Sequence, residues 1–407
     1  MVASTTGPNG LTTSFEYDAF GRKRKEIRAD GSETFTFLEA CGGDIICPAG
    51  AAFHTRVTDS SGAEGITYFN KLNQEIHKQS LLAGKWSIVD TEYDTQGRVV
   101  RKSEPYFDGD TVYWTQIEYD LIGRPILTTR PDGATQSVAY DGLTQVATNE
   151  LGQTKTVHKD IMGRMKSVID NAGHAIAYHY DALGQVTEML AAGKSQSFHY
   201  NIRGNKVRDT DPDKGTWTYR YNALGLLVAQ TDAKGQLTRM TYDVLGRMLT
   251  RIDDANTPNG ISDRTSSWVY DTAPMGIGKV HTVTKGEYTI TNSYDELGRP
   301  SSSTEEVDSK SFTTSTTYDA LSRPETMTYP SDGMASGIVT RNVYDGQGAL
   351  LRVESDADGS AYWERQEVDA RGNITKARMG NGVETTKMYT PEIGRLSGIV
   401  SAHGGAT

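Results

Sequence analysis

Residues 242–247 read Tyr-Asp-Val-Leu-Gly-Arg, and variants of this hexapeptide recur along the chain. Further strong copies are Tyr17-Asp-Ala-Phe-Gly21-Arg22, Tyr93-Asp-Thr-Gln-Gly97-Arg98, Tyr119-Asp-Leu-Ile-Gly123-Arg124 and Tyr294-Asp-Glu-Leu-Gly298-Arg299. With weaker copies, such as the one that begins at Tyr221, the sequence holds 16 units about 25 residues apart. A tandem repeat of this period outweighs the two or three domains that a length of 407 residues would otherwise suggest.

Two turn signals divide each unit. One is the Asp-x-Leu-Gly segment itself, and the other follows about ten residues later, as in Pro131-Asp-Gly133 and Asp232-Ala-Lys-Gly235. Aspartate starts turns by accepting bonds from its own backbone, and glycine supplies the positive φ that such turns need. Between turns, Trp217-Thr-Tyr-Arg-Tyr221 places an aromatic residue at every second position, which puts all three on one strand face. Each unit is therefore predicted to be a hairpin of two short strands.

Sixteen hairpins give about 32 strands, and at ~4.8 Å per strand the strip would span on the order of 150 Å. Open twisted sheets of that width curl or close. We therefore predict an all-β fold in which tandem hairpins form a long antiparallel sheet strip that coils into a shell-like wall or solenoid. The expected organisation is a lead-in over 1–10, a repeat array over 11–398 with an irregular cysteine-containing insertion around 38–56, and a tail over 399–407.

The motif residues have predicted structural roles. The tyrosine ring packs on the strand face, the aspartate caps the turn, and the glycine permits the bend. The arginine lies over a neighbouring unit's tyrosine or pairs with its aspartate. The residues expected to hold the array are Tyr17, Gly21, Arg22, Tyr93, Gly97, Arg98, Tyr119, Gly123, Arg124, Tyr221, Tyr242, Gly246, Arg247, Tyr294, Gly298 and Arg299.

Charge and hydropathy exclude several classes of protein. The chain has 42 basic and 52 acidic residues, so its net charge of −10 disfavours nucleic acid as a partner. No apolar run approaches the ~18 residues that a membrane-spanning helix needs. Residues 1–10 have neither the basic start nor the apolar stretch of a secretory signal, so no signal peptide is predicted in this chain.

The tandem Tyr-Asp-x-x-Gly-Arg units resemble the YD repeats of the Rhs (rearrangement hotspot) family. That family includes Rhs polymorphic toxins, the B and C components of Tc toxin complexes, wall-associated bacterial proteins and animal teneurins. The resemblance covers residues from about 10 to 398. It implies a long β-strip wound into a hollow shell, which in the toxin members encloses a C-terminal toxin polypeptide. It also implies a secreted or cell-surface location within a bacterial toxin or secretion system.

The sequence departs from the complete toxin pattern. Toxin members end their repeats with an Asp-Pro-x-Gly-type box that supports autoproteolytic release, and no such box precedes Ala402-His-Gly-Gly-Ala-Thr407. Asp211-Pro212 lies in the middle of the repeats, so it does not match. The chain is expected to be a repeat segment of something larger, or a truncated family member, without enzymatic activity of its own. Its partners would include the remaining parts of a larger Rhs or Tc protein.

Cys41 and Cys47 form the one cysteine pair. A short-loop disulfide and two free thiols both fit the sequence. A zinc site with His54 lacks a fourth ligand and a second cysteine pair, so no metal and no cofactor are predicted. The acidic residues of Asp209-Thr-Asp-Pro-Asp213 alternate as in a calcium loop, but Lys214 occupies the position where that loop needs glycine, so an ordinary turn is expected.

Two functions fit these observations. The first is a structural segment of a toxin shell that encapsulates and sequesters a toxin or effector polypeptide. The alternative is a cell-surface or secreted repeat protein that binds carbohydrate or a partner protein through aromatic faces, although packing between hairpins explains the same aromatic residues.

Overall fold

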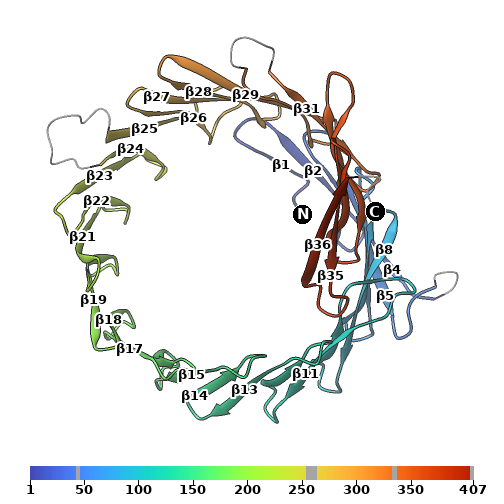
Figure 1. Cartoon of the computed structure of the whole chain (residues 1–407), viewed down its shortest axis with the longest axis horizontal. Helices are drawn as coiled ribbons and strands as arrows, with labels where there is room; N and C mark the ends of the chain where they lie inside the picture. Colours follow the sequence, from blue (N-terminus) through green and yellow to red (C-terminus); the bar gives the residue numbers. More distant parts are fainter. Residues whose placement is uncertain (43–45, 254–263, 332–336, 404–407) are drawn as a thin grey trace. The chain divides into compact units, whose positions relative to one another are not determined.

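A computed structural model of the chain describes residues 1–42, 46–253, 264–331 and 337–403. The elements assigned in these ranges are β-strands numbered β1 to β36, and Figure 1 labels many of them. The predicted all-β fold of tandem antiparallel hairpins is thus confirmed. Among the same residues we find no helix with the length and apolar character needed to span a membrane. Parts of the predicted cysteine insertion (43–45) and of the predicted tail (404–407) lie outside the described residues.

The first strands are β1 (Ser4–Thr6), β2 (Thr12–Tyr17), β3 (Lys23–Ile27), β4 (Glu33–Ala40), β5 (Phe53–Asp59), β6 (Glu64–Phe69), β7 (Glu75–Leu82), β8 (Lys85–Tyr93), β9 (Val99–Ser103), β10 (Tyr106–Phe107), β11 (Trp114–Tyr119) and β12 (Pro125–Thr129). The next are β13 (Thr135–Asp141), β14 (Thr144–Thr148), β15 (Thr154–Lys159), β16 (Met165–Ile169), β17 (Ala175–Tyr180), β18 (Val186–Ala191), β19 (Lys194–Tyr200), β20 (Lys206–Asp211), β21 (Gly215–Tyr221), β22 (Leu227–Thr231), β23 (Leu237–Tyr242) and β24 (Met248–Ile252). The last are β25 (Thr265–Tyr270), β26 (Val280–Lys285), β27 (Tyr288–Tyr294), β28 (Pro300–Val307), β29 (Lys310–Tyr318), β30 (Pro324–Thr328), β31 (Val339–Tyr344), β32 (Leu350–Ser355), β33 (Ala361–Val368), β34 (Ile374–Met379), β35 (Val383–Tyr389) and β36 (Leu396–His403).

The chain divides into two compact units. Unit 1 contains Met1–Ala134, Tyr294–Ser302 and Thr313–Thr407, and unit 2 contains Thr135–Ser293 and Ser303–Phe312. Strand β1 lies in the stretch predicted as a lead-in, and β36 runs into the stretch predicted as a tail. The paired strands therefore extend further toward both ends than the predicted array.

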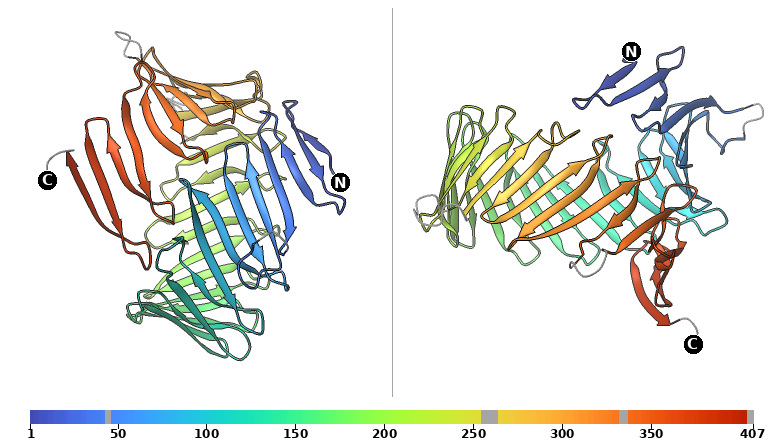
Figure 2. Two further views of the ribbon diagram at one scale, coloured as in Figure 1. Left: turned by 90° about the vertical axis from the view of Figure 1, so that its right-hand side faces the viewer. Right: turned by 90° about the horizontal axis from the view of Figure 1, so that it is seen from above.

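Successive strands pair antiparallel in chain order, so each hairpin lies beside the next (Figure 2). The small strand β10 departs from this order, because it pairs with β8 while β9 pairs with β11. At the motif tyrosines the register shifts by one residue, as between Thr241 and Tyr242 on β23. Such a bulge beside a turn raises the local twist of the hairpin.

Few side chains are buried. The buried hydrophobic residues are Tyr68, Ile88, Met240, Ala273, Ala370 and Ala377. On β21, Trp217, Tyr219 and Tyr221 are half-buried while Thr218 and Arg220 between them are exposed, which is the predicted alternation. A sheet with so small a buried core depends on its hydrogen-bonded ladders, its turns and contacts between neighbouring hairpins.

Within unit 1, turns near the C-terminus approach turns near the N-terminus. A Cβ atom on Gly62 would lie 2.1 Å from the carbonyl oxygen of Gly346, and one on Gly348 would lie 2.7 Å from Ser61 Oγ. The hydroxyl of Ser322 donates to a carboxylate oxygen of Asp30. Further along, Ser87 Oγ donates to the carbonyl of Ala370 over 2.6 Å. Residues separated by nearly 300 positions thus pack against each other within unit 1, from turn to turn or, at Ser87 of β8, from strand to turn.

Candidate functional site: the repeat turn and the polar row of β4 to β8

The repeat turn is closed by aspartate. In Asp243–Arg247, the backbone N–H of Gly246 donates to the carbonyl of Asp243 (3.1 Å), and the N–H of Asp243 donates to the carbonyl of Arg247 (2.9 Å). Asp243 Oδ1 accepts the N–H groups of Leu245 and Arg247, both at 2.9 Å. The bend needs a left-handed residue, and Gly246 has φ +82°. The other predicted glycines have the same sign of φ: Gly21 (+80°), Gly97 (+81°), Gly123 (+87°) and Gly298 (+69°).

The arginine braces the same turn. Nε of Arg22, Arg98, Arg124, Arg247 and Arg299 donates to the Oδ2 atom of its own repeat's aspartate at 2.6–2.7 Å. Most of these guanidinium groups also reach the next repeat. The Cζ atom lies 4.6 Å from the ring centroid of Tyr119 for Arg98, 4.4 Å from Tyr270 for Arg247 and 4.3 Å from Tyr318 for Arg299. Arg22 differs, because it lies over Phe20 of its own turn at 5.0 Å.

The tyrosine hydroxyl ties its strand to the hairpin before it. Each donates to a backbone carbonyl about 15 to 20 residues earlier. The pairs are Tyr17 to Val2 (2.7 Å), Tyr93 to Glu75 (2.9 Å), Tyr119 to Val99 (2.8 Å), Tyr221 to Lys206 (2.9 Å) and Tyr242 to Leu227 (2.7 Å). Burial raises the pKa of Tyr294, the remaining predicted tyrosine. Each repeat is thus linked to the hairpin before it by its tyrosine, and most repeats are linked to the repeat after them by their arginine.

The turn carboxylates are stabilised in their charged form. The backbone N–H of Arg98 is the main cause that lowers the pKa of Asp94, and the Arg98 guanidinium adds to it. The pKa of Asp271 is lowered to about 2, chiefly because the Arg247 side chain donates to it and secondarily because the Gly278 N–H does so. Arg247 therefore holds two aspartates, one from its own repeat and one from the next.

A second feature is a row of polar and aromatic side chains at paired positions of adjacent strands. Glu39 on β4 pairs with His54 on β5, His54 with Tyr68 on β6, Tyr68 with His77 on β7, and His77 with Asp90 on β8. We call these five residues the polar row. His54 is 5% exposed and Tyr68 is 8% exposed, which is unusual in so thin a sheet.

At each end of the polar row a histidine contacts a carboxylate. His54 Nε2 lies 3.0 Å from Glu39 Oε2, and His77 Nδ1 donates to Asp90 Oδ1. The hydroxyl of Tyr106 donates to Asp90 Oδ2 over 2.6 Å. Burial acts to raise the pKa of Asp90, but the bonds from His77 and Tyr106 outweigh it, so the pKa lies below its usual value. Burial, together with Asp90, raises the pKa of Tyr106.

The predicted cysteine pair lies beside this row. Cys41 and Cys47 are joined by a disulfide in the structure. Cys47 Sγ lies 3.9 Å from Nδ1 of His54, so that imidazole stands between a sulfur and the carboxylate of Glu39. The sequence predicts that His54 lies near the cysteines, because it follows them closely in the chain. It does not predict that Glu39, Tyr68, His77 and Asp90 lie beside His54, because these residues are aligned by the register of the paired strands.

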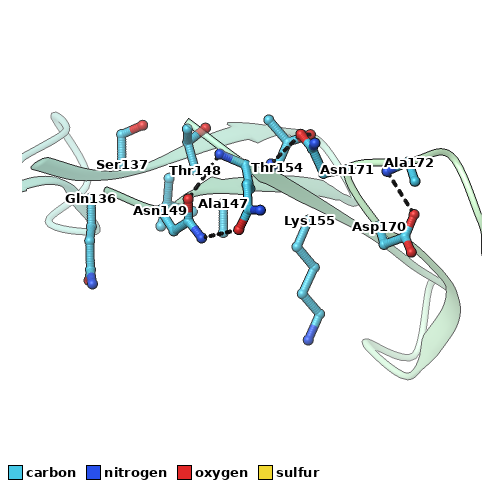
Figure 3. A pocket seen from close by; sticks show the side chains of 12 residues that line it. Gln136, Ser137, Ala147, Thr148, Asn149, Thr154, Lys155, Asp170, Asn171 and Ala172 are labelled. Carbon is cyan, nitrogen blue, oxygen red and sulfur yellow. Dashed lines mark hydrogen bonds between the residues drawn. The ribbon is translucent and has the colours of Figure 1, made fainter. Parts of the chain in front are cut away.

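Two hollows lie on the surface, one beside the polar row in unit 1 and one in unit 2. One, of about 600 Å³, is lined by His77 and Asp90 of the polar row and by Trp114. The other, of about 690 Å³, lies in unit 2 between β13, β14, β15 and the turn after β16 (Figure 3). Its polar groups are used by local structure: Asn149 Oδ1 accepts from Leu151 and Gln153, and Asn171 Oδ1 accepts from Thr154.

The acidic segment at 209–213 does not gather into one cluster. Asp209 is 2% exposed and accepts from Lys206 Nζ (2.6 Å) and from the hydroxyl of Tyr219 (3.1 Å). Asp211 instead caps its own turn by accepting the N–H groups of Asp213 and Lys214. Burial and the Asp209 carboxylate raise the pKa of Tyr219 to about 12.

Together, the repeated hairpins and their turn contacts define a repeat protein built from a single β-strip. A family model described as RHS Repeat matches residues 1–33, 200–236 and 221–258. The predicted resemblance to the Rhs, or YD-repeat, family is confirmed by this match and by Rhs proteins among the curated relatives.

Curated relatives include Double-stranded DNA deaminase toxin A from Burkholderia cenocepacia, which is 25% identical over 63% of this chain and 17% of its own length. Probable deoxyribonuclease RhsB from Dickeya dadantii is 26% identical over 73% of this chain and 24% of its own length. Human Teneurin-4 is 26% identical over 41% of this chain and 6% of its own length. The chain thus spans a quarter or less of each of these three proteins.

Solved structures share the fold over the whole chain. The crystal structure of TcdB2-TccC3-TEV matches with a TM-score of 0.78 at 14% identity, covering 100% of this chain and 29% of that one. The Tc holotoxin pore of Photorhabdus luminescens matches with a TM-score of 0.78 at 14% identity, covering 99% and 29%. At this identity the likeness concerns the fold.

Proposed function

We propose that this chain is a wall segment of a bacterial toxin shell that encloses an effector polypeptide and keeps it from solvent and from partners. The observation that carries the proposal is the match of the whole chain to the TcdB2-TccC3 fold. Curated relatives named as a DNA deaminase toxin and a deoxyribonuclease support a toxin context. The repeat array acts structurally in this proposal, and the toxic activity belongs to a polypeptide outside the 407 residues.

The turn tips support a wall that continues beyond this chain. In unit 2, the apolar residues that precede the turn glycine are largely exposed, at 77% for Leu183, 73% for Leu224 and 74% for Leu245. In unit 1, Phe20 and Ile122 at the same motif position are also exposed, at 84% and 75%, whereas Leu297 and Leu321 are half-buried, and the turn that holds Leu321 contacts Asp30 through Ser322. Further repeats packed on the exposed tips would bury them in the same way.

The aromatic faces favour packing over sugar binding. The guanidinium carbon of Arg101 lies 4.4 Å from the Trp114 ring centroid, and Nζ of Lys214 lies 4.7 Å from that of Trp217. Both rings are half-buried. Because cations already cover these rings, a sugar would have to displace them in order to stack.

Limited proteolysis of the complete natural gene product tests the proposal. An enclosed effector should resist a protease that digests the same effector expressed alone, and the resistance should end when the repeats are unfolded. Equal cleavage of the attached and the isolated effector would contradict enclosure. Cleavage of a protease-sensitive surface loop elsewhere in the protein serves as an internal control for protease activity.

A further inference from the structure

Three potential metal ligands converge at the end of the polar row. The sulfur atoms of Cys41 and Cys47 and one ring nitrogen of His54 all lie within 4.8 Å of one another. These residues come from the end of β4, from the segment before β5 and from β5 itself. Thiolate sulfur and imidazole nitrogen are the ligand types that zinc and similar soft divalent metals prefer.

The neighbours of His54 orient its imidazole as they would orient a metal ligand. It is 5% exposed, and its Nε2 is engaged by Glu39 Oε2 at 3.0 Å, which leaves Nδ1 directed at the sulfur of Cys47 at 3.9 Å. The ring of Tyr68 packs against it with centroids 5.2 Å apart. In metal sites the ligating histidine commonly donates its second ring nitrogen to a carboxylate, which fixes its orientation and raises its basicity. Glu39 occupies that supporting position here.

We propose that Cys41, Cys47 and His54 form a binding site for a soft divalent metal, zinc first, that opens when the disulfide is reduced. In the structure the two sulfurs are bonded to each other, so they are not available as thiolates. A dithiol reductant breaks the S–S bond by transferring two electrons and two protons, which yields two thiols while the reductant becomes a disulfide. Metal binding then releases the thiol protons and forms two metal–sulfur bonds and one metal–nitrogen bond.

Three protein ligands leave one coordination position for water. Structural zinc sites are closed by four protein ligands, whereas sites with three protein ligands hold water or substrate at the fourth position. The insertion that interrupts the regular repeat spacing thereby has two alternative cross-links, a disulfide under oxidising conditions and a metal under reducing conditions. Both join the residue after β4 to the segment before β5, and the metal would add His54 of β5.

Cobalt titration of the whole chain tests the site. After reduction with an excess of a phosphine and its removal under anaerobic conditions, Co²⁺ should give thiolate charge-transfer and tetrahedral d–d absorption at one equivalent, and Zn²⁺ should displace it. The unreduced protein should give neither signal. His54→Gln and Cys47→Ser should abolish the thiolate–histidine spectrum, whereas Glu39→Gln should weaken affinity by roughly 10- to 100-fold.

Two controls keep the outcome interpretable. His174→Gln removes a histidine whose side chain is 80% exposed and lies far along the chain, so it should bind cobalt as the wild type does. Because His54 is buried, circular dichroism should establish that each variant keeps its strand content, and Glu39→Gln, which changes a half-exposed side chain, tests the site without removing a ligand. The proposal is overturned if the reduced wild type gives no cobalt spectrum, or if binding persists unchanged in both His54→Gln and Cys47→Ser.

Discussion

The guanidinium of Arg299 lies over the ring of Tyr318, with Cζ 4.3 Å from the ring centroid. The same guanidinium donates to Asp295 of its own turn through Nε (2.7 Å) and to Ser322 of the next turn (2.9 Å). Tyr318 in turn donates its hydroxyl to the carbonyl of Pro300 over 2.8 Å. One arginine and one tyrosine therefore connect two successive repeat turns, and the repetition of this contact replaces a deep hydrophobic core.

This contact predicts energetic coupling between the two residues. In a double-mutant cycle, Arg299→Leu and Tyr318→Leu should each destabilise the protein, and the pair should lose less than the sum of the two. The expected coupling is about 0.5–1 kcal/mol, as for a partly exposed cation–π pair. Urea unfolding of the four proteins measures it. Strict additivity would show that the stacking carries no energy.

The left-handed turn position predicts a graded response at Gly246. Gly246→Val should lower the melting temperature clearly, because a β-branched residue at φ +82° is strained by about 1–3 kcal/mol. Gly246→Asn should be mild, since Asn73 already occupies the equivalent turn position with φ 60°. Thermal unfolding followed by circular dichroism compares the two variants. Equal melting temperatures for wild type and Gly246→Val would refute the turn assignment.

Because each motif tyrosine hydroxyl bonds to the preceding hairpin, we predict that removing one hydroxyl lowers the stability of the fold. Tyr221→Phe deletes the bond to the carbonyl of Lys206, so the free energy of unfolding should fall by about 0.5–1.5 kcal/mol. Tyr362→Phe is the matched control, because Tyr362 is 45% exposed and lies outside the repeat motif. Denaturant unfolding of the wild type and of both variants measures these changes in the free energy of unfolding. A loss at Tyr362 as large as that at Tyr221 would contradict the anchoring role.

The turn carboxylates predict instability in acid. The pKa values of Asp18, Asp94, Asp120, Asp243, Asp295 and Asp319 are all lowered from their usual value of 3.8 in the folded protein. The unfolded chain therefore binds more protons as the pH falls. The stabilisation is fully present above about pH 5 and is lost as the pH falls through 3.8 and then through the lower folded values. Melting temperature should decline steeply below about pH 4, and a flat profile down to about pH 2.5 would contradict this.

The close approach within unit 1 predicts a difference between two glycines of equal φ. Gly348 (φ +81°) faces Ser61 at 2.7 Å, whereas a Cβ on Gly133 (φ +80°) meets nothing within 4 Å. Gly348→Ala should increase amide exchange in the turn around Ser61 beyond any effect of Gly133→Ala. Hydrogen exchange followed by mass spectrometry measures the exchange rate of the amides in that turn. Identical exchange in the two variants would mean that the turn-to-turn contact is not formed in solution.

Most of the fold could be predicted from residues that act within a single repeat. The aspartate, the left-handed glycine and the alternating strand residues are all encoded within one repeat of about 25 residues, so the all-β hairpin array could be inferred from sequence. Between two such turns, β7 covers Glu75–Leu82, and its His77 pairs with Tyr68 on β6 and with Asp90 on β8.

Contacts set by register or by long-range packing could not be predicted in this way. The polar row depends on how five strands align, and no spacing rule places Glu39 beside His54 or His77 beside Asp90. The approach of Ser322 to Asp30 joins residues 292 positions apart, and nothing in either turn indicates the other. The family resemblance gave the shell expectation, but these individual contacts required the structure.

Native mass spectrometry of the complete gene product, purified from its source, tests whether the repeats enclose a polypeptide. We predict an assembly heavier than the repeat segment in which a second polypeptide, covalent or cleaved, stays associated until the β-strip is denatured. A species in which the repeats carry no enclosed polypeptide, and from which every other segment dissociates without unfolding, would contradict a role in encapsulation.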